Sequence, residues 1–311
     1  MTLRYLRSDA DVTVGRRLPT VLAREAGDSL HTALRAATRT YGLSRLGAPY
    51  WLARRFGGLL TTPLDTETVI RQTWRVAGGH RVDIALRANQ SDLTVLREVF
   101  AHRCYDLPAE HAGPMHTIVD LGANAGLASA YLSARHRPTT LIAVEPLAEN
   151  LTVLRHNAAC AGTRWIIEPC AAAPSPGSLD FHISGYWCTA SAVEAVGRYR
   201  LTQPHRIEQA MPRPPVTVAA DTVDAILARH NIDRVDLMKI DIEGGEFALL
   251  ADHPAWLRRV DRIVIEIHDK YIDGAPVRAA LTAAGLHRYP APHLDRTAPS
   301  GMAVELHVRT T

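Results

Sequence analysis

The stretch VDLGANAG, residues 119–126, decides the fold, because it leads from a short apolar strand through a glycine turn into a helix. Glycines at such a turn let a ligand approach the backbone closely. The spacing is G-x-N-x-G, which differs from the G-x-G-x-x-G of dinucleotide sites. Asp120 precedes the first glycine, and a carboxylate there would repel a pyrophosphate. It suits a ligand with positive charge, such as the ammonium and sulfonium groups of S-adenosylmethionine (SAM).

Short apolar runs alternate with helical segments from residue 116 onward. The runs of strand length are TIVDLG, LIAVEP, WIIEPC, VDLMKID and RIVIEIH. This alternation predicts a parallel sheet with helices on both faces. The last segments, LHRYP and GMAVELHVR, predict an antiparallel pair that closes one edge of the sheet.

A second acid follows the second predicted strand. Glu145 ends LIAVE, 19 positions after Gly126. An acid about 20 residues past the glycine turn can accept hydrogen bonds from the ribose hydroxyls of a nucleoside. Pro146 then fits the first turn of a helix, where a missing N–H costs nothing. Glu145 is therefore interpreted as a nucleoside ligand, with an exposed strand-end acid as the structural alternative.

Acidic groups also end two later strands. In KIDIEGGE, residues 239–246, Lys239 and Asp241 share one face of a strand. Asp241 then lies at the carboxyl end, where open α/β sheets bind ligands. Glu266 and His268 end the next strand and are expected to face the same crevice.

Composition limits the class of protein. The chain has 311 residues, of which 47% are hydrophobic, and a net charge of +3, so it can fold around a sizeable core. The four cysteines lack C-x-x-C spacing, which argues against a disulfide scaffold or a zinc module. The charged N-terminus offers no signal peptide, and no apolar run could cross a bilayer. We expect a cytoplasmic protein that binds neither nucleic acid nor membrane.

Two regions are expected along the chain. Residues 1–110 are interpreted as a helical extension with a β-hairpin at Gly78-Gly79, acting as a cap or as a homodimerisation arm. Ser91 is a candidate N-cap for the helix that follows the hairpin. Residues 111–311 are expected to form the cofactor-binding core.

An insertion at 184–215 interrupts the core. It exceeds the ordinary connection of about 4–6 residues, so it is expected to form the acceptor pocket, with a surface loop as the alternative. Aromatic faces and a polar edge suit a sugar or an aromatic ring. The proposed substrate-binding residues are Tyr186, Trp187, Tyr199 and His205.

The order and combination of these motifs resembles the FkbM family of SAM-dependent methyltransferases. The similar stretches are ANQSDLTVLREVFAHRCY, VDLGANAGLAS, AVEPLAENLTVLRHN, DLMKIDIEGGEFALL and IVIEIH, which span roughly residues 87–290. The resemblance implies a class I, Rossmann-like α/β fold. Its mostly parallel seven-stranded sheet would carry helices on both faces, with the N-terminal helical and hairpin extension added.

The resemblance also implies an activity. It is that of a SAM-dependent O-methyltransferase (EC 2.1.1 class) acting on a hydroxyl of a sugar, nucleoside or polyketide-type secondary metabolite, as in antibiotic biosynthesis. The acceptor would be a small molecule.

Roles pass from the family to individual residues. The glycine turn would bind the methionine end of SAM, Glu145 the ribose, and the backbone at Cys170 the adenine. The implied cofactor-binding residues are Asp120, Gly122, Ala123, Asn124, Gly126, Glu145, Pro146, Cys170, Ala171, Ser91, Asp92, Tyr105 and Asp241.

Methyl transfer to a hydroxyl needs an aligned acceptor and a base that removes its proton. The candidate catalytic residues are Asp241, His268, Glu243 and Glu266, with His268 and Asp241 ranked first. A metal-assisted version would hold Mg²⁺ between Asp241 and Asp269, although no metal is expected.

Two other function classes stay open. An NAD(P)-dependent oxidoreductase would use a Rossmann-type glycine turn, but without the acid that precedes it here. The other is a SAM-binding scaffold that has lost catalysis. The acids retained at two strand ends argue against this alternative. Methylation of nucleic acid is not favoured, because no basic stripe interleaved with aromatic residues occurs.

Overall fold

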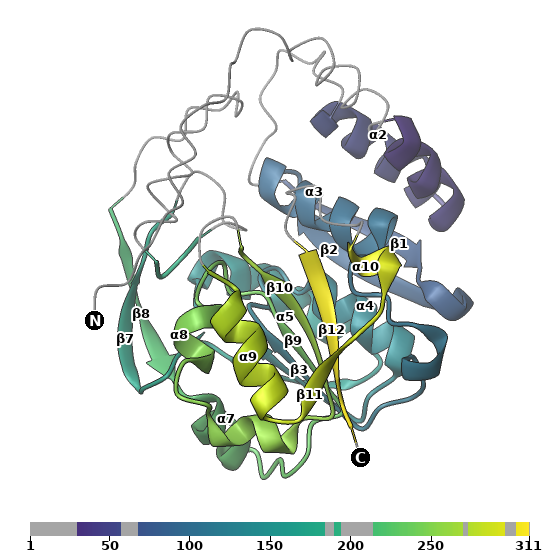
Figure 1. Cartoon of the computed structure of the whole chain (residues 1–311). Coiled ribbons are helices and arrows are strands. Elements are labelled where there is room, and N and C mark those ends of the chain that lie inside the picture. The colour runs from purple at the N-terminus through teal and green to yellow at the C-terminus, as the bar shows by residue number, and fades with distance from the viewer. Residues whose placement is uncertain are drawn as a thin grey trace, which may run out of the picture.

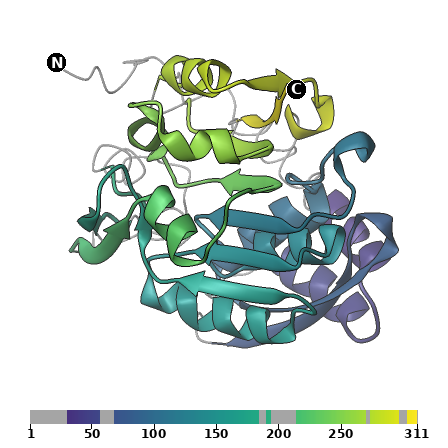
Figure 2. The same cartoon turned by 90° about the horizontal axis from the view of Figure 1, so that it is seen from below.

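The computed structural model describes residues 30–56, 68–183, 190–193, 214–269, 273–295 and 303–310. Its centre is a seven-stranded sheet with helices on both faces (Figures 1 and 2). The strand order across the sheet is β11-β12-β10-β9-β3-β4-β5. These strands are β3 (Thr117–Leu121), β4 (Thr140–Val144), β5 (Arg164–Glu168), β9 (Leu237–Ile240), β10 (Arg262–Ile267), β11 (Leu286–Tyr289) and β12 (Ala303–Arg309).

All strands of this sheet run parallel except β12. β3 pairs in parallel with β4 and β9, and β5 and β10 extend the parallel set on either side. β12 pairs antiparallel with both β10 and β11 at the edge. The expected parallel sheet with an antiparallel closing pair is therefore confirmed.

The middle strands are apolar at consecutive positions because helices cover both of their faces. In β3, Ile118 belongs to one hydrophobic cluster and Val119 to another, as the alternation of side chains along a strand requires. The helices of the first face are α4 (Leu127–His136) and α5 (Ala148–Cys160). Those of the second are α7 (Val223–Arg229), α8 (Glu246–Leu250) and α9 (Ala275–Ala283).

The described part of the N-terminal region packs on the face formed by α4 and α5. The side chain of Asn157 in α5 accepts from the N–H of Ala85 at 2.7 Å and donates to its carbonyl at 2.9 Å. The ring of Phe100 contacts those of Trp74 and Tyr131. The elements of this region are a helix at 30–39, α2 (Ser44–Phe56), β1 (Val69–Arg75), β2 (Arg81–Arg87), α3 (Gln90–Leu96) and a π-helix (Arg97–His102).

β1 and β2 form the antiparallel hairpin that the sequence predicts around Gly78-Gly79. Both glycines have φ of 82°, a conformation that other residues rarely adopt. The predicted cap of the next helix is two residues away from the observed one. Asn89, and not Ser91, is the N-cap of α3, because its side chain accepts from the N–H of Asp92.

A second sheet, β6-β8-β7, flanks the insertion expected at 184–215. Only 190–193 and 214–215 of that insertion are described, so Tyr186, Trp187, Tyr199 and His205 lie outside the described residues. No helix in the described ranges is long and apolar enough to cross a membrane. The remaining elements are β6 (Ala171–Ala172), β7 (Gly177–Phe181), β8 (Val216–Asp221), α10 (Pro292–Asp295) and short 3₁₀ turns at Ala77–Gly79, Ala109–His111 and Ala255–Arg259.

Candidate active site

A cavity of about 390 Å³ lies at the carboxyl ends of the central strands, where open α/β sheets bind ligands. Its volume is within the usual range for small-molecule sites, about 300–1,000 Å³. The predicted site residues that line it are Tyr105, Gly122, Ala123, Asn124, Glu145, Pro146, Cys170, Ala171, Asp241, Glu243, Glu266 and His268. The structure therefore brings these predicted residues together around one cavity, and their roles stay predictions.

The glycine turn after β3 lies directly against the turn after β9. Gly122 has φ of 78°, and a Cβ added to it would lie 1.9 Å from the carbonyl oxygen of Asp241. Only glycine fits at this contact. Gly126 lies at the start of α4 with φ of 82°, and its added Cβ would meet Leu154 of α5 at 2.6 Å. Gly126 does not line the cavity, so its role is helix packing and not the predicted ligand contact.

Glu145 is a buried carboxylate at the end of β4. Its Oε2 accepts from the N–H of Asn124 at 2.8 Å, and its Oε1 accepts from Leu147 and Asn150. Burial raises the pKa of Glu145, and these hydrogen bonds oppose the rise. A carboxylate offers about four acceptor positions, so a position stays available for a ligand hydroxyl. Pro146 lines the cavity but precedes α5, which begins at Ala148, so it is not in the first helical turn as predicted.

Asp120 does not face the cavity. Its side chain is fully buried, Oδ2 accepts from Ser129 Oγ at 2.6 Å, and Oδ1 lies 3.0 Å from Lys239 Nζ. Lys239 also donates to the carbonyl of Gly122 at 2.7 Å. Burial alone would lower the pKa of Lys239, but Asp120 and Asp241 outweigh it and raise the pKa. The prediction that Asp120 contacts the cofactor is corrected, because Lys239 neutralises its charge inside the sheet.

Ser91 and Asp92 also lie outside the cavity wall. Asp92 is buried and forms a two-pronged ion pair with Arg87, at 2.7 and 2.9 Å, which fixes the start of α3. The ion pair gives Asp92 a structural role, and the cavity geometry does not support the predicted cofactor contact of either residue. Tyr105, by contrast, lines the cavity and donates its hydroxyl to Asp241 Oδ2 at 2.9 Å.

The sequence did not identify Glu98, which lines the cavity from the π-helix. A π-helix inserts one residue into a helical turn and often occurs at functional sites. The periodicity of the segment gives no signal for that insertion. The wall on this side is completed by Thr94, Val95, Val99 and Cys104.

Cys170 and Ala171 follow β5 and line the side of the cavity formed with the small sheet. Burial raises the pKa of Cys170 to about 11, so its sulfur stays a thiol at neutral pH. A thiol is a weak hydrogen-bonding group. The expectation that the backbone, and not the thiol, contacts a ligand here remains a prediction.

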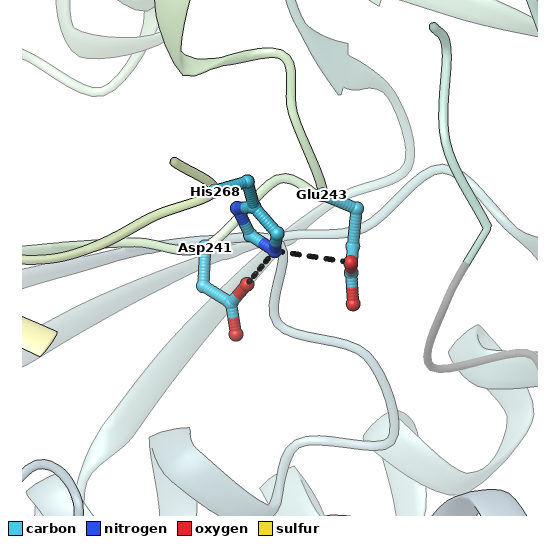
Figure 3. Close-up of side chains that lie close together, drawn as sticks. All are labelled: Asp241, Glu243 and His268. Atoms are coloured by element: carbon cyan, nitrogen blue, oxygen red, sulfur yellow. Dashed lines mark ion pairs between the residues drawn. The ribbon is translucent and has the colours of Figure 1, made fainter. Parts of the chain in front are cut away.

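His268 is held between carboxylates at the end of β10. Its Nε2 lies 3.1 Å from Glu243 Oε2 and 3.9 Å from Asp241 Oδ1 (Figure 3). Its Nδ1 lies 3.0 Å from Glu246 Oε1. Burial alone would lower the pKa of His268, but Glu246 and Glu243 outweigh it and raise the pKa well above its usual range. An imidazolium cannot accept a proton, so the ranking of His268 as a leading base is corrected.

Asp241 is the better base. Burial raises the pKa of Asp241, and Lys239 opposes the rise, so the group keeps a carboxylate form of increased basicity. Burial also raises the pKa of Glu266 well above its usual range, and repulsion from Asp241 adds to the rise. Glu266 is thereby favoured as a neutral acid that can donate a hydrogen bond into the cavity.

Asp269 points away from this cluster. Its carboxylate accepts from Arg278 at 2.5 and 3.0 Å and from the N–H of Gly274 at 3.1 Å. It does not line the cavity. The predicted Mg²⁺ pair of Asp241 and Asp269 is therefore wrong, because an arginine occupies both oxygens of Asp269.

Comparisons with known proteins agree with this geometry. The family described as "Methyltransferase FkbM domain" matches residues 120–286, more than half of the chain. The chain is 26% identical over 197 residues to "31-O-demethyl-FK506 methyltransferase FkbM" of Streptomyces tacrolimicus, covering 58% of this chain and 75% of that protein. It is also 26% identical over 234 residues to "AMB antimetabolite synthetase AmbE" of Pseudomonas aeruginosa, covering 68% of this chain but 11% of that much longer protein.

Among solved structures, methyltransferase FkbM from Methylobacillus flagellatus matches with a TM-score of 0.39 and 15% identity. The match covers 63% of this chain and 44% of that one. At this TM-score the likeness does not decide the fold, which rests on the strand order and the antiparallel β12 described above. The sheet is that of a class I, Rossmann-like methyltransferase. The family match extends from the glycine turn to the start of β11. Because it covers more than half of the chain, the chain belongs to the FkbM methyltransferase family.

Proposed function

We propose that the chain transfers the methyl group of SAM to a hydroxyl oxygen of a small-molecule acceptor. In this reaction the methyl–sulfur bond breaks, a methyl–oxygen bond forms, and the acceptor proton passes to Asp241. The observation that carries the proposal is the Asp241 carboxylate, which faces the cavity with raised pKa beside the glycine turn. A base of raised pKa at the reacting centre suits an alcohol, whose proton becomes acidic only as the bond to the methyl group forms.

The charges of the cavity support a cationic cofactor. The basic side chains among its described lining residues are Lys239 and His268. Lys239 is paired with Asp120, and His268 lies between Glu243 and Glu246. The pyrophosphate of a nicotinamide dinucleotide would find carboxyl groups there in place of free cations, so the geometry disfavours the oxidoreductase alternative.

SAM would lie across the strand ends in this proposal. Glu145 would accept a ribose hydroxyl, the Gly122–Asn124 turn would contact the methionine end, and the backbone at Cys170 and Ala171 would contact the adenine. The sulfonium methyl would then face Asp241. The Asn124 N–H donates to Glu145, so the glycine turn and the proposed ribose ligand are held together.

The acceptor is proposed to be a sugar, a nucleoside or a polyketide-type secondary metabolite, as in antibiotic tailoring. The Streptomyces tacrolimicus relative is named as a methyltransferase of 31-O-demethyl-FK506. In this chain, Ala190, Ala192 and Val193 of the insertion line the cavity, and Ser191 Oγ donates to the Glu243 carbonyl at 2.6 Å. This contact supports the proposal that the insertion contributes to the acceptor pocket, with the N-terminal region as the opposite wall.

Calorimetry with S-adenosylhomocysteine and with NAD tests the cofactor class. We expect saturable binding of S-adenosylhomocysteine and none of NAD at the same concentration. A parallel incubation with methyl-labelled SAM and a panel of glycosylated metabolites tests the acceptor class, since the carbon chemical shift of the labelled methyl group separates O-methyl from N-methyl products. NAD binding without S-adenosylhomocysteine binding, or label found on nitrogen, would overturn the proposal.

A further inference from the structure

Three potential metal ligands converge on one point of the cavity wall. They are Asp241 and Glu243, after β9, and His268, after β10, and all three line the cavity (Figure 3). One oxygen or nitrogen atom from each lies within 4.8 Å of the other two. Bonds of about 2.0–2.2 Å to one ion place neighbouring ligand atoms roughly 3–4 Å apart. The distances from His268 Nε2 to Glu243 Oε2 and Asp241 Oδ1, 3.1 and 3.9 Å, are in that range.

The histidine is oriented as metal-binding histidines are. Its Nδ1 faces Glu246 Oε1 at 3.0 Å, and Glu246 is completely buried. With Nδ1 turned to Glu246, Nε2 faces Asp241 and Glu243, and a bound ion would replace the proton that the imidazolium carries on Nε2. A buried carboxylate that holds the far ring nitrogen is the usual outer partner of a histidine ligand.

Glu246 also fixes the turn that carries Glu243. Its Oε1 accepts from the N–H groups of Ile242 and Gly244, each at 3.2 Å. Glu243 itself has φ of 57°, a left-handed conformation that is uncommon for a residue with a side chain. A strained position that a buried carboxylate stabilises indicates that the placement of Glu243 matters.

One oxygen of Asp241 lacks a partner at this point. Oδ2 accepts from the Tyr105 hydroxyl, whereas Oδ1 is shielded from solvent and receives no hydrogen bond within the described ranges. It is Oδ1 that faces His268 Nε2. With Glu243 and Glu246 also around the imidazole, negative charge is in excess there, and burying such an excess is costly.

We propose that Asp241, Glu243 and His268 bind one divalent transition-metal ion whose remaining coordination positions face the cavity. Two carboxylate oxygens and an imidazole nitrogen suit Mn²⁺, Fe²⁺ or Zn²⁺ better than Mg²⁺, which prefers oxygen ligands alone. The proposal deepens the proposed function and rests on it for its chemistry. The ion would bind the acceptor hydroxyl and make it release its proton to Asp241 Oδ2 more readily.

Mn²⁺ binding to the full chain tests the site without any acceptor. After treatment with EDTA and dialysis, the chain is titrated with Mn²⁺, and free Mn²⁺ is measured by electron paramagnetic resonance. We expect about one ion per chain, displaced by Zn²⁺. Glu243→Gln and His268→Gln should each weaken binding at least about tenfold. Asp269→Asn is the matched control, because it removes a nearby carboxylate that is bound to Arg278, and it should bind Mn²⁺ as the wild type does.

Thermal unfolding and S-adenosylhomocysteine binding of each variant report whether it is folded. If buried His268→Gln fails to fold, Glu243→Gln alone decides, since its side chain is partly exposed to the cavity. No Mn²⁺ or Zn²⁺ binding by the wild type at concentrations up to about 1 mM would overturn the site, as would wild-type affinity in folded Glu243→Gln. The cofactor measurements above are independent of the metal, so failure of the site and failure of the proposed function are distinguishable.

Discussion

Lys239 and Asp120 are direct neighbours in the central sheet, and the Lys239 ammonium lies 3.0 Å from Oδ1 of Asp120. Both side chains are buried, and Lys239 extends from this pair to the carbonyl of Gly122. One ammonium thus neutralises a buried acid and holds the glycine turn in place. This pair connects the stability of the sheet to the shape of the cofactor cavity.

Lys239→Met should destabilise the chain strongly. It leaves Asp120 buried without its cation, and breaking a buried pair costs about 3–5 kcal/mol. Urea unfolding measures the loss. The double variant Asp120→Asn/Lys239→Met should recover part of it, because Asp120 then carries no unpaired charge, while Asp241 still lacks the ammonium 3.9 Å away. The exposed pair of Arg234 with Asp261 gives the control, and Arg234→Met should change stability little. If Lys239→Met and Arg234→Met lower the free energy of unfolding equally, this account of the buried pair is contradicted.

Gly122→Ala should abolish S-adenosylhomocysteine binding. The added methyl group would meet the Asp241 carbonyl, so the turns after β3 and β9 would have to separate. Gly79→Ala is the matched control, because Gly79 has nearly the same positive φ but nothing within 4 Å of its added Cβ. That variant should lose about 1–2 kcal/mol of stability from backbone strain alone and keep its affinity. Calorimetry should separate them, and equal affinity in both would contradict the close contact.

Glu145→Gln should weaken S-adenosylhomocysteine binding about tenfold or more. A hydrogen bond to a charged group contributes about 1.5–3 kcal/mol, and the amide also presents a donor to Asn124 or Leu147, whose N–H groups need acceptors. Glu149→Gln changes an exposed acid in the first turn of α5 and should leave affinity unchanged. Wild-type affinity in folded Glu145→Gln would remove Glu145 from the ribose site.

His136 should make the chain sensitive to acid. Burial lowers the pKa of His136 to about 4, while its Nδ1 faces the Gly113 carbonyl at 3.1 Å. The unfolded histidine titrates near 6.5, so the unfolded state binds more protons between these two values. The contribution of neutral His136 to the free energy of unfolding is therefore fully present above about pH 6.5. It is lost as the pH drops toward 4, by up to about 3 kcal/mol.

His136→Gln should flatten that fall, because glutamine can donate to Gly113 and does not titrate. His116→Gln, at an exposed position, is the control and should keep the wild-type pH dependence. Urea unfolding at a series of pH values checks both. If the free energy of unfolding falls as steeply with decreasing pH in His136→Gln as in the wild type, other groups cause the loss of stability in acid.

Local patterns predicted the sheet, the hairpin and most of the cavity. Apolar runs and glycine turns are short-range signals, and parallel strands bring their carboxyl ends together, so Glu145 and Asp241 could be placed at one edge. The partners of buried charges could not be predicted in this way. Asp120 meets Lys239 across 119 residues of sequence, and His268 meets Glu243 and Glu246 from the next strand. Those contacts decide which acid faces the ligand and which histidine can act as a base.

The remaining differences between prediction and structure concern two helical segments of the N-terminal region. Glu98 enters the cavity from a π-helix, and the start of α3 is capped by Asn89, two residues before the predicted cap Ser91. The π-helix packs against α4, and the periodicity of its own segment does not encode it. The cap is a local choice between Asn89 and Ser91, two residue types that both cap helices. The acceptor residues expected in the insertion stay predictions.

Methyl transfer by wild type and by Asp241→Asn tests the central claim most directly. Methyl-labelled SAM is incubated with a hydroxyl acceptor found in the panel, and the rate of ether formation is measured together with S-adenosylhomocysteine affinity. General base catalysis contributes roughly 10²–10⁴-fold, so kcat of Asp241→Asn should fall at least about a hundredfold while affinity stays within about twofold. Wild-type kcat in Asp241→Asn would contradict the account, because another group would then remove the acceptor proton.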